Sequence, residues 1–475
     1  MMQENKTRRV DLGLLLSYLL LIVFGWLNIY SAVYSEEHGF ILDMSQRYGQ
    51  QFIWIGLSIF TAIFILYIIR PEIYSTLSPI LYIIMAVLLF AVIFVGKEVN
   101  GSKSWFFIGS FGLQPAEFSK ITTSLLLSYI MSQYGFTLTN KKMAATAAVV
   151  VLLPILLIIM EKETGSALVY LGLLFVFYMQ GMSGWFIILG FSLAAIFSLT
   201  ISFSPLTAIV CALAACSLLR LLIWKRGKWF ISAVAVIVLI AYLPKLYATL
   251  PFLELFKPEV WALILFIPHT ILWIVDIYKM REDRGSFYLI LSLICAIAIT
   301  FSINIIFNKV LQPHQKARIE NLFGITEDLQ GIGYNVHQSK IAIGSGGLTG
   351  KGFLNGTQTK YNFVPEQSTD FIFCTVGEEW GFVGSLLLLI VYIYLIVRII
   401  VLASKNFDTF TKLYGYCVAS IFLMHVVINM GMTMGLLPVI GIPLPFLSYG
   451  GSSMLSFTIL LFIFIRLDME RQSKE

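Results

Sequence analysis

The feature that most constrains this chain is a succession of apolar runs of about 20 residues, separated by shorter polar segments. A helix of about that length crosses the hydrocarbon core of a bilayer. The runs lack the alternating pattern of barrel strands, and only helices and closed barrels satisfy their backbone groups inside lipid. The sequence therefore predicts an all-α polytopic membrane protein, and the charged share of 12% agrees with that class.

The apolar runs predict about fourteen membrane-spanning helices. They cover residues 12–33, 50–69, 74–96, 117–133, 143–160, 166–181, 184–203, 205–224, 229–249, 259–278, 286–307, 375–401, 412–435 and 449–466. The first run follows Lys6, Arg8 and Arg9, as the apolar part of a signal peptide would. Because it is too long for one and lacks a small-residue cleavage site, we expect it to remain as the first span.

Lys and Arg residues in short loops favour the cytoplasmic side of a membrane. If the amino terminus is cytoplasmic, the segments predicted on that side hold Arg70, Lys141, Lys142, Lys225, Arg226, Lys228, Lys279, Arg281, Arg284, Lys405, Arg466, Arg471 and Lys474. We therefore expect both termini inside, and segments 97–116, 161–165, 308–370 and 436–448 outside. Much of the net charge of +6 belongs to the cytoplasmic loops, so it does not indicate a nucleic-acid partner.

Signatures of common cofactors are missing from the sequence. The five cysteines lie in apolar segments without metal-binding spacing, which favours buried small hydrophobes over disulfides. Residues 344–352 are rich in glycine, but Ser345 and Gly352 stand where a phosphate loop needs glycine and Ser or Thr. We expect no haem, zinc or nucleotide site.

The long outer loop re-enters the apolar sequence at residues 361–373, where Glu366 and Asp370 lie four residues apart. If a helix begins near Pro365, the two carboxylates share one face. A carboxylate sheltered between apolar spans has a raised pKa and can serve as a general base. The alternative is structural, with Asp370 capping a helix that starts at Phe371.

The segment 97–116 leads into a predicted helix. Pro115 suits the first helical position, Gln114 the cap and Glu117 the first turn. Glu117 and Lys120 then share one face near the membrane boundary, where ionisable residues usually have a function. A well-capped helix explains the same residues equally well.

Three further segments contain candidate substrate-binding residues. The loop 308–370 combines Lys340 and other cations with many glycines, which suits a diphosphate or an anionic headgroup, although a basic solvated loop is the alternative. Residues 435–453, which include Ser448, hold too many prolines and glycines for regular helix and predict a cavity wall. Glu163 begins another span from the outer side, as many solvated helix starts do.

Five motifs together resemble the SEDS family (shape, elongation, division and sporulation) of bacterial cell-wall polymerases. They are residues 338–347, 356–359, 365–371, 377–381 and 443–453. The Gly-Thr-Gln-Thr element and the Phe-Val-Pro-Glu run that follows match the elongation members of the family better than the division members. The resemblance covers residues 1–200 and 300–470 and implies a core of ten helices.

The resemblance implies a peptidoglycan glycosyltransferase that polymerises lipid II at the outer face of the bacterial cytoplasmic membrane during elongation, releasing undecaprenyl diphosphate. The implied partners are lipid II, undecaprenyl-diphosphate-linked glycan, membrane lipids and a class B penicillin-binding protein. The family's essential aspartate falls on Asp370. Its Pro-Ala-Glu-Phe-x-Lys motif falls on residues 115–120.

We expect an inverting transfer in one step, with Asp370 as general base and with Lys120 and Lys340 binding the departing diphosphate. Glu117 and Glu366 would orient these groups or hold a divalent metal. A divalent cation, Mg²⁺ or Mn²⁺, is the one candidate cofactor, with Glu366 and Asp370 as its candidate ligands. The residues expected to contact substrate are Trp105, Glu117, Lys120, Glu163, Lys340, Glu366 and Ser448.

The chain departs from the family pattern in two places. Residues 162–167 lack the usual proline and have Glu163 in place of the usual aspartate. Residues 204–300 add about four spans, for which we expect a peripheral packing or partner-binding role. The expected organisation is a first part of the core at 1–203, inserted spans at 204–300, and a second part with the outer loop at 301–475.

Two other functions remain open from the sequence. A lipid II flippase would place ionisable residues through the bilayer midplane, whereas here they gather at the outer boundary, which favours a surface enzyme. A non-catalytic scaffold of the cell-wall machinery would tolerate substitution of its carboxylates.

Overall fold

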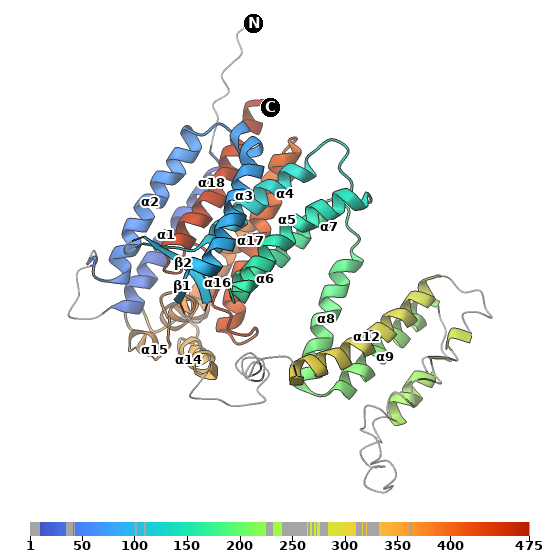
Figure 1. Cartoon of the computed structure of the whole chain (residues 1–475). Coiled ribbons are helices and arrows are strands. Elements are labelled where there is room, and N and C mark those ends of the chain that lie inside the picture. Colours follow the sequence, from blue (N-terminus) through green and yellow to red (C-terminus); the bar gives the residue numbers. More distant parts are fainter. Residues whose placement is uncertain are drawn as a thin grey trace. The chain divides into compact units, whose positions relative to one another are not determined.

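The computed structural model describes residues 10–34, 41, 43–99, 102–108, 111–224, 231–239, 264, 267, 270–271, 273–275, 284–309, 316, 320, 332–361 and 363–474. They fall into two compact units (Figure 1). Unit 1 comprises Met1–Met182 and Asp328–Glu475, and unit 2 comprises Ser183–Glu327. The candidate site residues all belong to unit 1.

The helices of unit 1 are α1 (Leu12–Val33), α2 (Arg47–Tyr67), α3 (Glu72–Val95), α4 (Pro115–Met131), α5 (Lys141–Met160), α6 (Thr164–Val169), the 3₁₀ helix η2 (Tyr170–Leu173), α7 (Leu174–Met179), α14 (Ile332–Ser345), α15 (Thr357–Lys360), α16 (Ile372–Ser404), α17 (Thr409–Thr433) and α18 (Gly451–Lys474). Its strands are β1 (Lys97–Val99), β2 (Ser102–Ile108) and β3 (Phe111–Leu113). Unit 2 contains α8 (Trp185–Ser202), α9 (Pro205–Trp224) and α12 (Arg284–Lys309).

The apolar runs fold as helices, which confirms the predicted all-α membrane-protein class. Among the described residues, nine helices are long and apolar enough to cross a membrane. The run predicted at 166–181 is divided, because η2 separates α6 from α7. The spans predicted at 229–249 and 259–278 extend beyond the described residues, so the count of fourteen stays a prediction.

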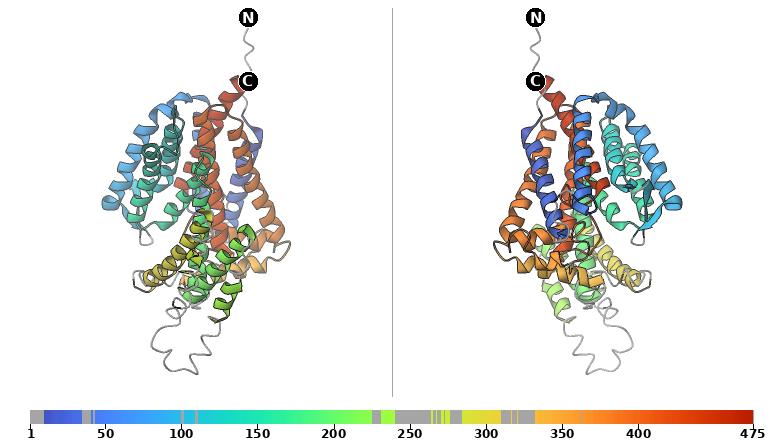
Figure 2. Two further views of the ribbon diagram at one scale, coloured as in Figure 1. Left: turned by 90° about the vertical axis from the view of Figure 1, so that its right-hand side faces the viewer. Right: turned by 90° about the vertical axis from the view of Figure 1, so that its left-hand side faces the viewer.

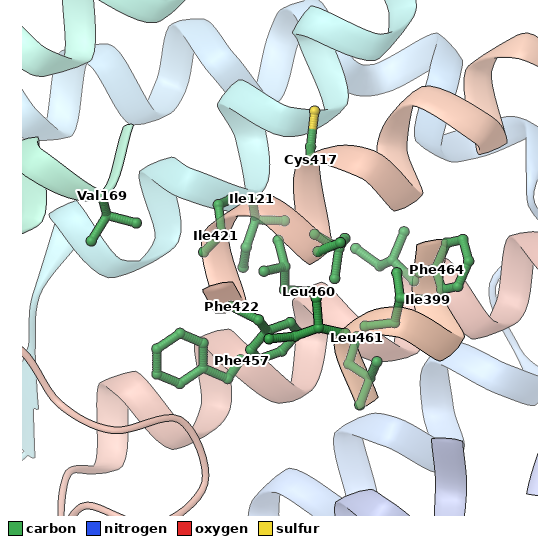
Figure 3. Packing of buried hydrophobic residues seen from close by; sticks show 14 of the residues in the cluster. Ile121, Val169, Ile399, Cys417, Ile421, Phe422, Phe457, Leu460, Leu461 and Phe464 are labelled. Atoms are coloured by element: carbon green, nitrogen blue, oxygen red, sulfur yellow. The ribbon is translucent and has the colours of Figure 1, made fainter. Parts of the chain in front are cut away.

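Helices α17 and α18 form the centre of unit 1, and 83% of the apolar window of each is buried. Figure 2 shows α1 and α16 on one side of this pair and α4 and α5 on the other. Phe422 of α17 and Phe457 of α18 have ring centroids 5.7 Å apart, and Figure 3 shows them beside Leu460, with Ile121 of α4 nearby. Within a bilayer, van der Waals packing of this kind holds helices together.

The two long outer segments contain structure that the sequence analysis treats as loop. Between α3 and α4, the chain forms an antiparallel sheet in the order β1-β2-β3, with Lys97 opposite Trp105 and Phe106 opposite Leu113. The loop 308–370 contains α14 and α15. The strands and α15 are too short to give a clear sequence period, and α14, with 14 residues, is too short to cross a membrane.

Helix α16 is interrupted at Gly381, whose φ of 63° and ψ of −159° are not helical. On the amino-terminal side, the carbonyls of Glu378 and Glu379 accept hydrogen bonds from the amides of Lys351 and Gly352. On the other side, the amides of Phe382 and Val383 donate to Gly347 and Leu348. The loop 347–352 therefore completes the broken helix through its main chain, as buried irregular backbone at membrane depth requires.

The short elements of unit 1 gather at one end of its helices, opposite the end where α1 begins and α18 finishes (Figure 1). We call the end at which these short elements gather the Asp370 end. It contains the sheet, α14, α15 and the starts of α4, α6, α16 and α18. All residues predicted to contact substrate lie in or beside these elements.

Candidate active site

Asp370 lies in a turn rather than in a helix. Residues 365–371 form turns, and α16 begins only at Ile372. The predicted helix start near Pro365 is wrong, because Glu366 has a φ of 54°, in the left-handed region that a right-handed helix excludes. The capping alternative also fails, since the cap position of α16 is Phe371 and no side chain makes a capping bond there.

The carboxylate of Asp370 faces Gly441. A Cβ atom added to Gly441, whose φ is 73°, would lie 3.1 Å from Oδ2 of Asp370. The backbone carbonyl of Asp370 accepts a hydrogen bond of 2.8 Å from Nδ2 of Asn429. No hydrogen bond from the described residues reaches the carboxylate of Asp370. Burial, with the nearby charge of Glu366 as second cause, raises the pKa of Asp370 to about 6.

Glu366 points toward α2. Its carboxylate accepts hydrogen bonds from Nη1 of Arg47 at 3.2 Å and from Oγ1 of Thr369 at 3.1 Å. Its side chain is 48% exposed, so the ion pair contributes at most about 1 kcal/mol. Glu366 and Asp370 therefore do not share a helical face, although the charge of one still reaches the other.

The segment between α17 and α18 braces the Asp370 turn. Oγ of Ser448 donates to the carbonyl of Thr369 at 2.6 Å and accepts from the amide of Leu444 at 2.8 Å. The amide of Tyr449 donates to the carbonyl of Ser368 at 2.8 Å. Of residues 435–453, for which the sequence predicts no regular helix, residues 435–450 confirm the prediction, whereas residues 451–453 contradict it because α18 begins at Gly451. Residues 442–448 are packed inside the protein apart from the half-buried Pro443. Contact of Ser448 with substrate stays a prediction.

Glu117 and Lys120 form a buried ion pair. Pro115 is the first residue of α4, as predicted, and Gln114 occupies the cap position without a capping bond from its side chain. Nζ of Lys120 lies 2.9 Å from Oε2 of Glu117, and the two side chains are 1% and 2% exposed. Nζ also lies 2.9 Å from Nε2 of His425. The predicted shared face is confirmed.

Helix α17 links this ion pair to the Asp370 turn. His425 and Asn429 are one helical turn apart. Nδ2 of Asn429 contacts both the carbonyl of Asp370 and that of Ile442, and Nδ1 of His425 lies 3.1 Å from the carbonyl of Pro443. Neither residue is among the site residues predicted from the sequence, where the available signal is a pair of polar residues four apart inside the apolar run 412–435.

Glu163 is not the solvated helix start that the sequence allows. Its Oε1 accepts a hydrogen bond of 2.7 Å from Nε2 of Gln114 and another from Oγ of Ser166. Burial raises the pKa of Glu163, an effect that these two donors partly oppose. Gln114 thus joins the start of α6 to the start of α4.

Glu161, two residues before Glu163, is a second buried carboxyl group. It is 1% exposed, and neither of its oxygens has a hydrogen-bond partner in the part of the chain that the structure describes. Burial, followed by the charge of Glu163, raises the pKa of Glu161 to about 8. The group is therefore mostly protonated in the folded protein at neutral pH.

Replacing Glu161 by Gln is expected to stabilise the protein at pH 7.5. Because the folded pKa lies above the unfolded value, the carboxyl group costs stability as pH rises from about 4.5 toward 8, and the amide avoids this cost. We expect a gain of about 1–3 kcal/mol, seen as a higher Tm in thermal unfolding, that disappears near pH 4.5. Glu98→Gln, at an exposed position of β1, is the control; an equal gain there would contradict the explanation.

Lys340 and Trp105 lie on α14 and β2, elements that carry none of the predicted acidic site residues. Lys340 is exposed on α14, and its side chain packs on Gly435, where an added Cβ would lie 2.2 Å from Cε. Trp105 lies on β2 and packs on Gly112, whose carbonyl accepts a hydrogen bond from Oγ of Ser452. Among the described residues, neither forms a hydrogen bond or ion pair with Asp370. Their predicted contacts with substrate stay predictions.

Glu378 fixes the loop beside the site. Its carboxylate accepts hydrogen bonds from Nζ of Lys351 at 2.7 Å and from the amides of Gln358 and Thr359 at 2.9 and 3.0 Å. The neighbouring Glu379 accepts a hydrogen bond from Oγ of Ser31 in α1. Both carboxylates therefore hold the Gly-Thr-Gln-Thr element and α1 against α16.

The candidate metal ligands do not complete a metal site. The carboxylate of Glu366 is already occupied by Arg47, and the described residues contain no group of three or more His, Cys, Asp or Glu side chains that could hold a metal ion. A cavity of about 610 Å³ lined by Arg70, Glu72, Arg466 and Glu470 lies at the other end of unit 1. A divalent cation stays a prediction.

The family model for cell cycle proteins of the FtsW, RodA and SpoVE type matches residues 12–224 and 285–473. The unmatched residues 225–284 lie within the segment 204–300 that we expect to be inserted, and the predicted division of the chain at 203 and 300 stays a prediction.

Two curated relatives are similar over nearly the whole chain. The peptidoglycan glycosyltransferase RodA of Treponema pallidum is 33% identical over 448 residues, which are 94% of each chain. The peptidoglycan glycosyltransferase MrdB of Escherichia coli K12 is 30% identical over 447 residues, which are 94% of this chain and 90% of that one.

Solved structures have the same fold. A chain from a study of polymerization and crosslinking by a peptidoglycan synthase complex aligns with a TM-score of 0.59 and 21% identity, over 97% of this chain and 98% of that one. The rod shape determining protein RodA of Thermus thermophilus aligns with a TM-score of 0.53 and 19% identity over 97% of both chains.

Proposed function

Since the chain belongs to the family of cell cycle proteins that includes FtsW, RodA and SpoVE, we propose that it polymerises lipid II into glycan strands with Asp370 as the general base. It is a peptidoglycan glycosyltransferase, the activity for which its RodA and MrdB relatives are named. The single observation that carries the proposed role of Asp370 is its carboxylate, which is sheltered, free of hydrogen-bond donors among the described residues, and open toward Gly441.

The proposed reaction is a single displacement with inversion. A sugar hydroxyl of the acceptor gives its proton to the carboxylate of Asp370 while its oxygen forms a bond to the anomeric carbon of the donor. The bond from that carbon to the diphosphate oxygen breaks, and undecaprenyl diphosphate leaves with the electron pair. A pKa of about 6 suits a base that works near neutral pH, because the carboxylate is ionised but still basic.

A cation at the departing diphosphate would stabilise the charge that develops there. Lys340 is the better candidate of the two predicted lysines, because its exposed side chain has no hydrogen-bond partner among the described residues. Lys120 is buried and already paired with Glu117. Its proposed contribution is therefore to hold the start of α4 in place rather than to contact the diphosphate in this conformation.

The chain is a multi-pass membrane protein, as its apolar helices and its relatives support. We place the Asp370 end on the extracytoplasmic side of the bacterial inner membrane. Basic residues support this orientation, because Arg70 and Lys405 lie in segments that connect helices at the opposite end, and Lys141 begins α5 there.

We propose that the enzyme works with a class B penicillin-binding protein, which would cross-link the strands it makes. The support is the similar solved chain that comes from a peptidoglycan synthase complex, in which polymerization and crosslinking are structurally coordinated. The proposed substrates are lipid II and the undecaprenyl-diphosphate-linked glycan.

A reconstituted assay tests the proposed activity. Wild-type protein in liposomes with its partner is supplied with fluorescent lipid II, and the products are separated on a gel. Ladders of glycan strands are expected. Lipid II that becomes protected from an external quencher without forming polymer would instead support a flippase, and neither product would support a scaffold.

The pH dependence of polymerisation is expected to report Asp370. Because the base acts in its ionised form, kcat/KM should fall about tenfold per pH unit below about pH 6 and level off above it. Glu366→Gln removes the charge that helps raise this pKa, so the acidic limb should move to lower pH. Glu72→Gln at the other end of unit 1 should leave the limb in place. An unmoved limb in the Glu366 variant would contradict the assignment.

A further inference from the structure

His425 connects three parts of unit 1 through one buried ring, which is 1% exposed. Its Nε2 lies 2.9 Å from Nζ of Lys120 in α4, and its Nδ1 lies 3.1 Å from the carbonyl oxygen of Pro443. Its ring meets that of Phe457 in α18 edge to face, with centroids 4.7 Å apart. The ring is therefore fixed on both nitrogens and by its packing against Phe457.

The two polar contacts determine which nitrogen carries the proton. The carbonyl of Pro443 can only accept a hydrogen bond, so Nδ1 of His425 must donate to it. Nζ of Lys120 forms an ion pair with the carboxylate of Glu117, and an ammonium group can only donate hydrogen bonds, so Nε2 must accept. His425 is therefore neutral, with its proton on Nδ1, and any other form would break one of the contacts.

The contact between His425 and Pro443 lies close in sequence to the residue that faces Asp370, the proposed base. Gly441, which faces the carboxylate of Asp370, is two residues before Pro443. Asn429, one turn after His425, binds the carbonyl of Ile442 and that of Asp370. Two side chains of one helix thus hold consecutive carbonyls of the strip that borders the Asp370 carboxylate.

We propose that His425 is a positioning residue for glycan polymerisation, acting through the hydrogen bond from Nδ1 to Pro443. That bond sets the position of residues 441–443 and hence the space beside the carboxylate of Asp370. This inference rests on the proposed function. A shift of about 1 Å in groups around a reacting centre can cost about 10²-fold in rate.

Two matched substitutions separate the two contacts. In His425→Asn, the amide nitrogen replaces Nδ1 and keeps the bond to Pro443, but the acceptor for Lys120 is lost. In His425→Gln, the amide reaches the position of Nε2 and keeps the acceptor, but the donor to Pro443 is lost. Each variant lacks one hydrogen bond, so similar decreases in Tm are expected.

The measured quantities are kcat and KM for lipid II polymerisation by full-length protein with its partner, at a temperature where both variants are folded. We expect His425→Gln to lower kcat at least about tenfold with KM within about twofold, and His425→Asn to keep at least about a third of kcat. A merely structural histidine would give two variants of similar kcat. That result, or a more active His425→Gln, would overturn the proposal.

If His425→Gln does not accumulate, the same comparison is made between His425→Asn and His425→Met, which fills the space without a donor. A wild type that forms no glycan would refute the proposed function instead. A wild type that forms glycan, together with equally active His425 variants, would refute only this inference.

Discussion

Replacing Asp370 by Asn is expected to lower the rate of lipid II polymerisation by about 10²–10⁴-fold, the usual contribution of a general base. The amide has the shape of the carboxylate but cannot accept the proton of the attacking hydroxyl. The backbone carbonyl of residue 370 still accepts the hydrogen bond from Asn429, so the turn at residues 365–371 should keep its structure. The loss should appear in kcat, measured with fluorescent lipid II and the partner protein.

The thermal stability of Asp370→Asn shows whether a loss of activity comes from chemistry or from misfolding. Since burial raises the folded pKa of Asp370 to about 6, the ionised carboxylate costs stability above that pH, and Asn removes the cost. We expect a Tm at pH 7.5 equal to or above that of the wild type. An inactive but stable variant separates chemistry from folding, whereas a variant that polymerises at the normal rate would refute the proposed role.

Replacing Lys120 by Met is expected to destabilise the protein by about 3–5 kcal/mol, because it leaves the buried carboxylate of Glu117 without its cation. Nε2 of His425 would also lose its hydrogen-bond donor. The expected observation is a large decrease in Tm in detergent, together with loss of polymerisation.

The double variant Glu117→Gln with Lys120→Met is the control, since it removes both charges of the pair. Replacing a buried pair by neutral groups is often nearly neutral for stability. The double variant should therefore recover most of the lost Tm. If Lys120→Met alone were as stable as the wild type, the ion pair would not have the structural role assigned to it.

The sequence was sufficient for features that depend on local chemistry or long periodicity. Apolar runs of membrane-spanning length predicted the helices, and Pro115 predicted the start of α4. Spacing of three predicted that Glu117 and Lys120 share a face, and a density of prolines and glycines predicted the irregular segment before α18.

Features that depend on contacts between distant residues could not be predicted in this way. Glu366 has a left-handed backbone conformation, and nothing in residues 361–371 indicates that conformation. The turn around Glu366 contacts Arg47 and the segment before α18, both distant in sequence. Asn429 joins residues that are 59 and 13 positions away in the chain. Such bonds depend on which helices become neighbours, a choice that periodicity does not encode.

The interruption of α16 at Gly381 joins the first turns of this helix to the loop 347–352 in one hydrogen-bonded assembly. Residues 372–380 are bonded through main chain and through Glu378 to the loop 347–360, and Ile372, Phe373 and Val376 also belong to the hydrophobic core of the bundle. The turn that carries Asp370 adjoins this assembly. We therefore expect a ligand or partner that stabilises this loop to stabilise the turn around the base as well.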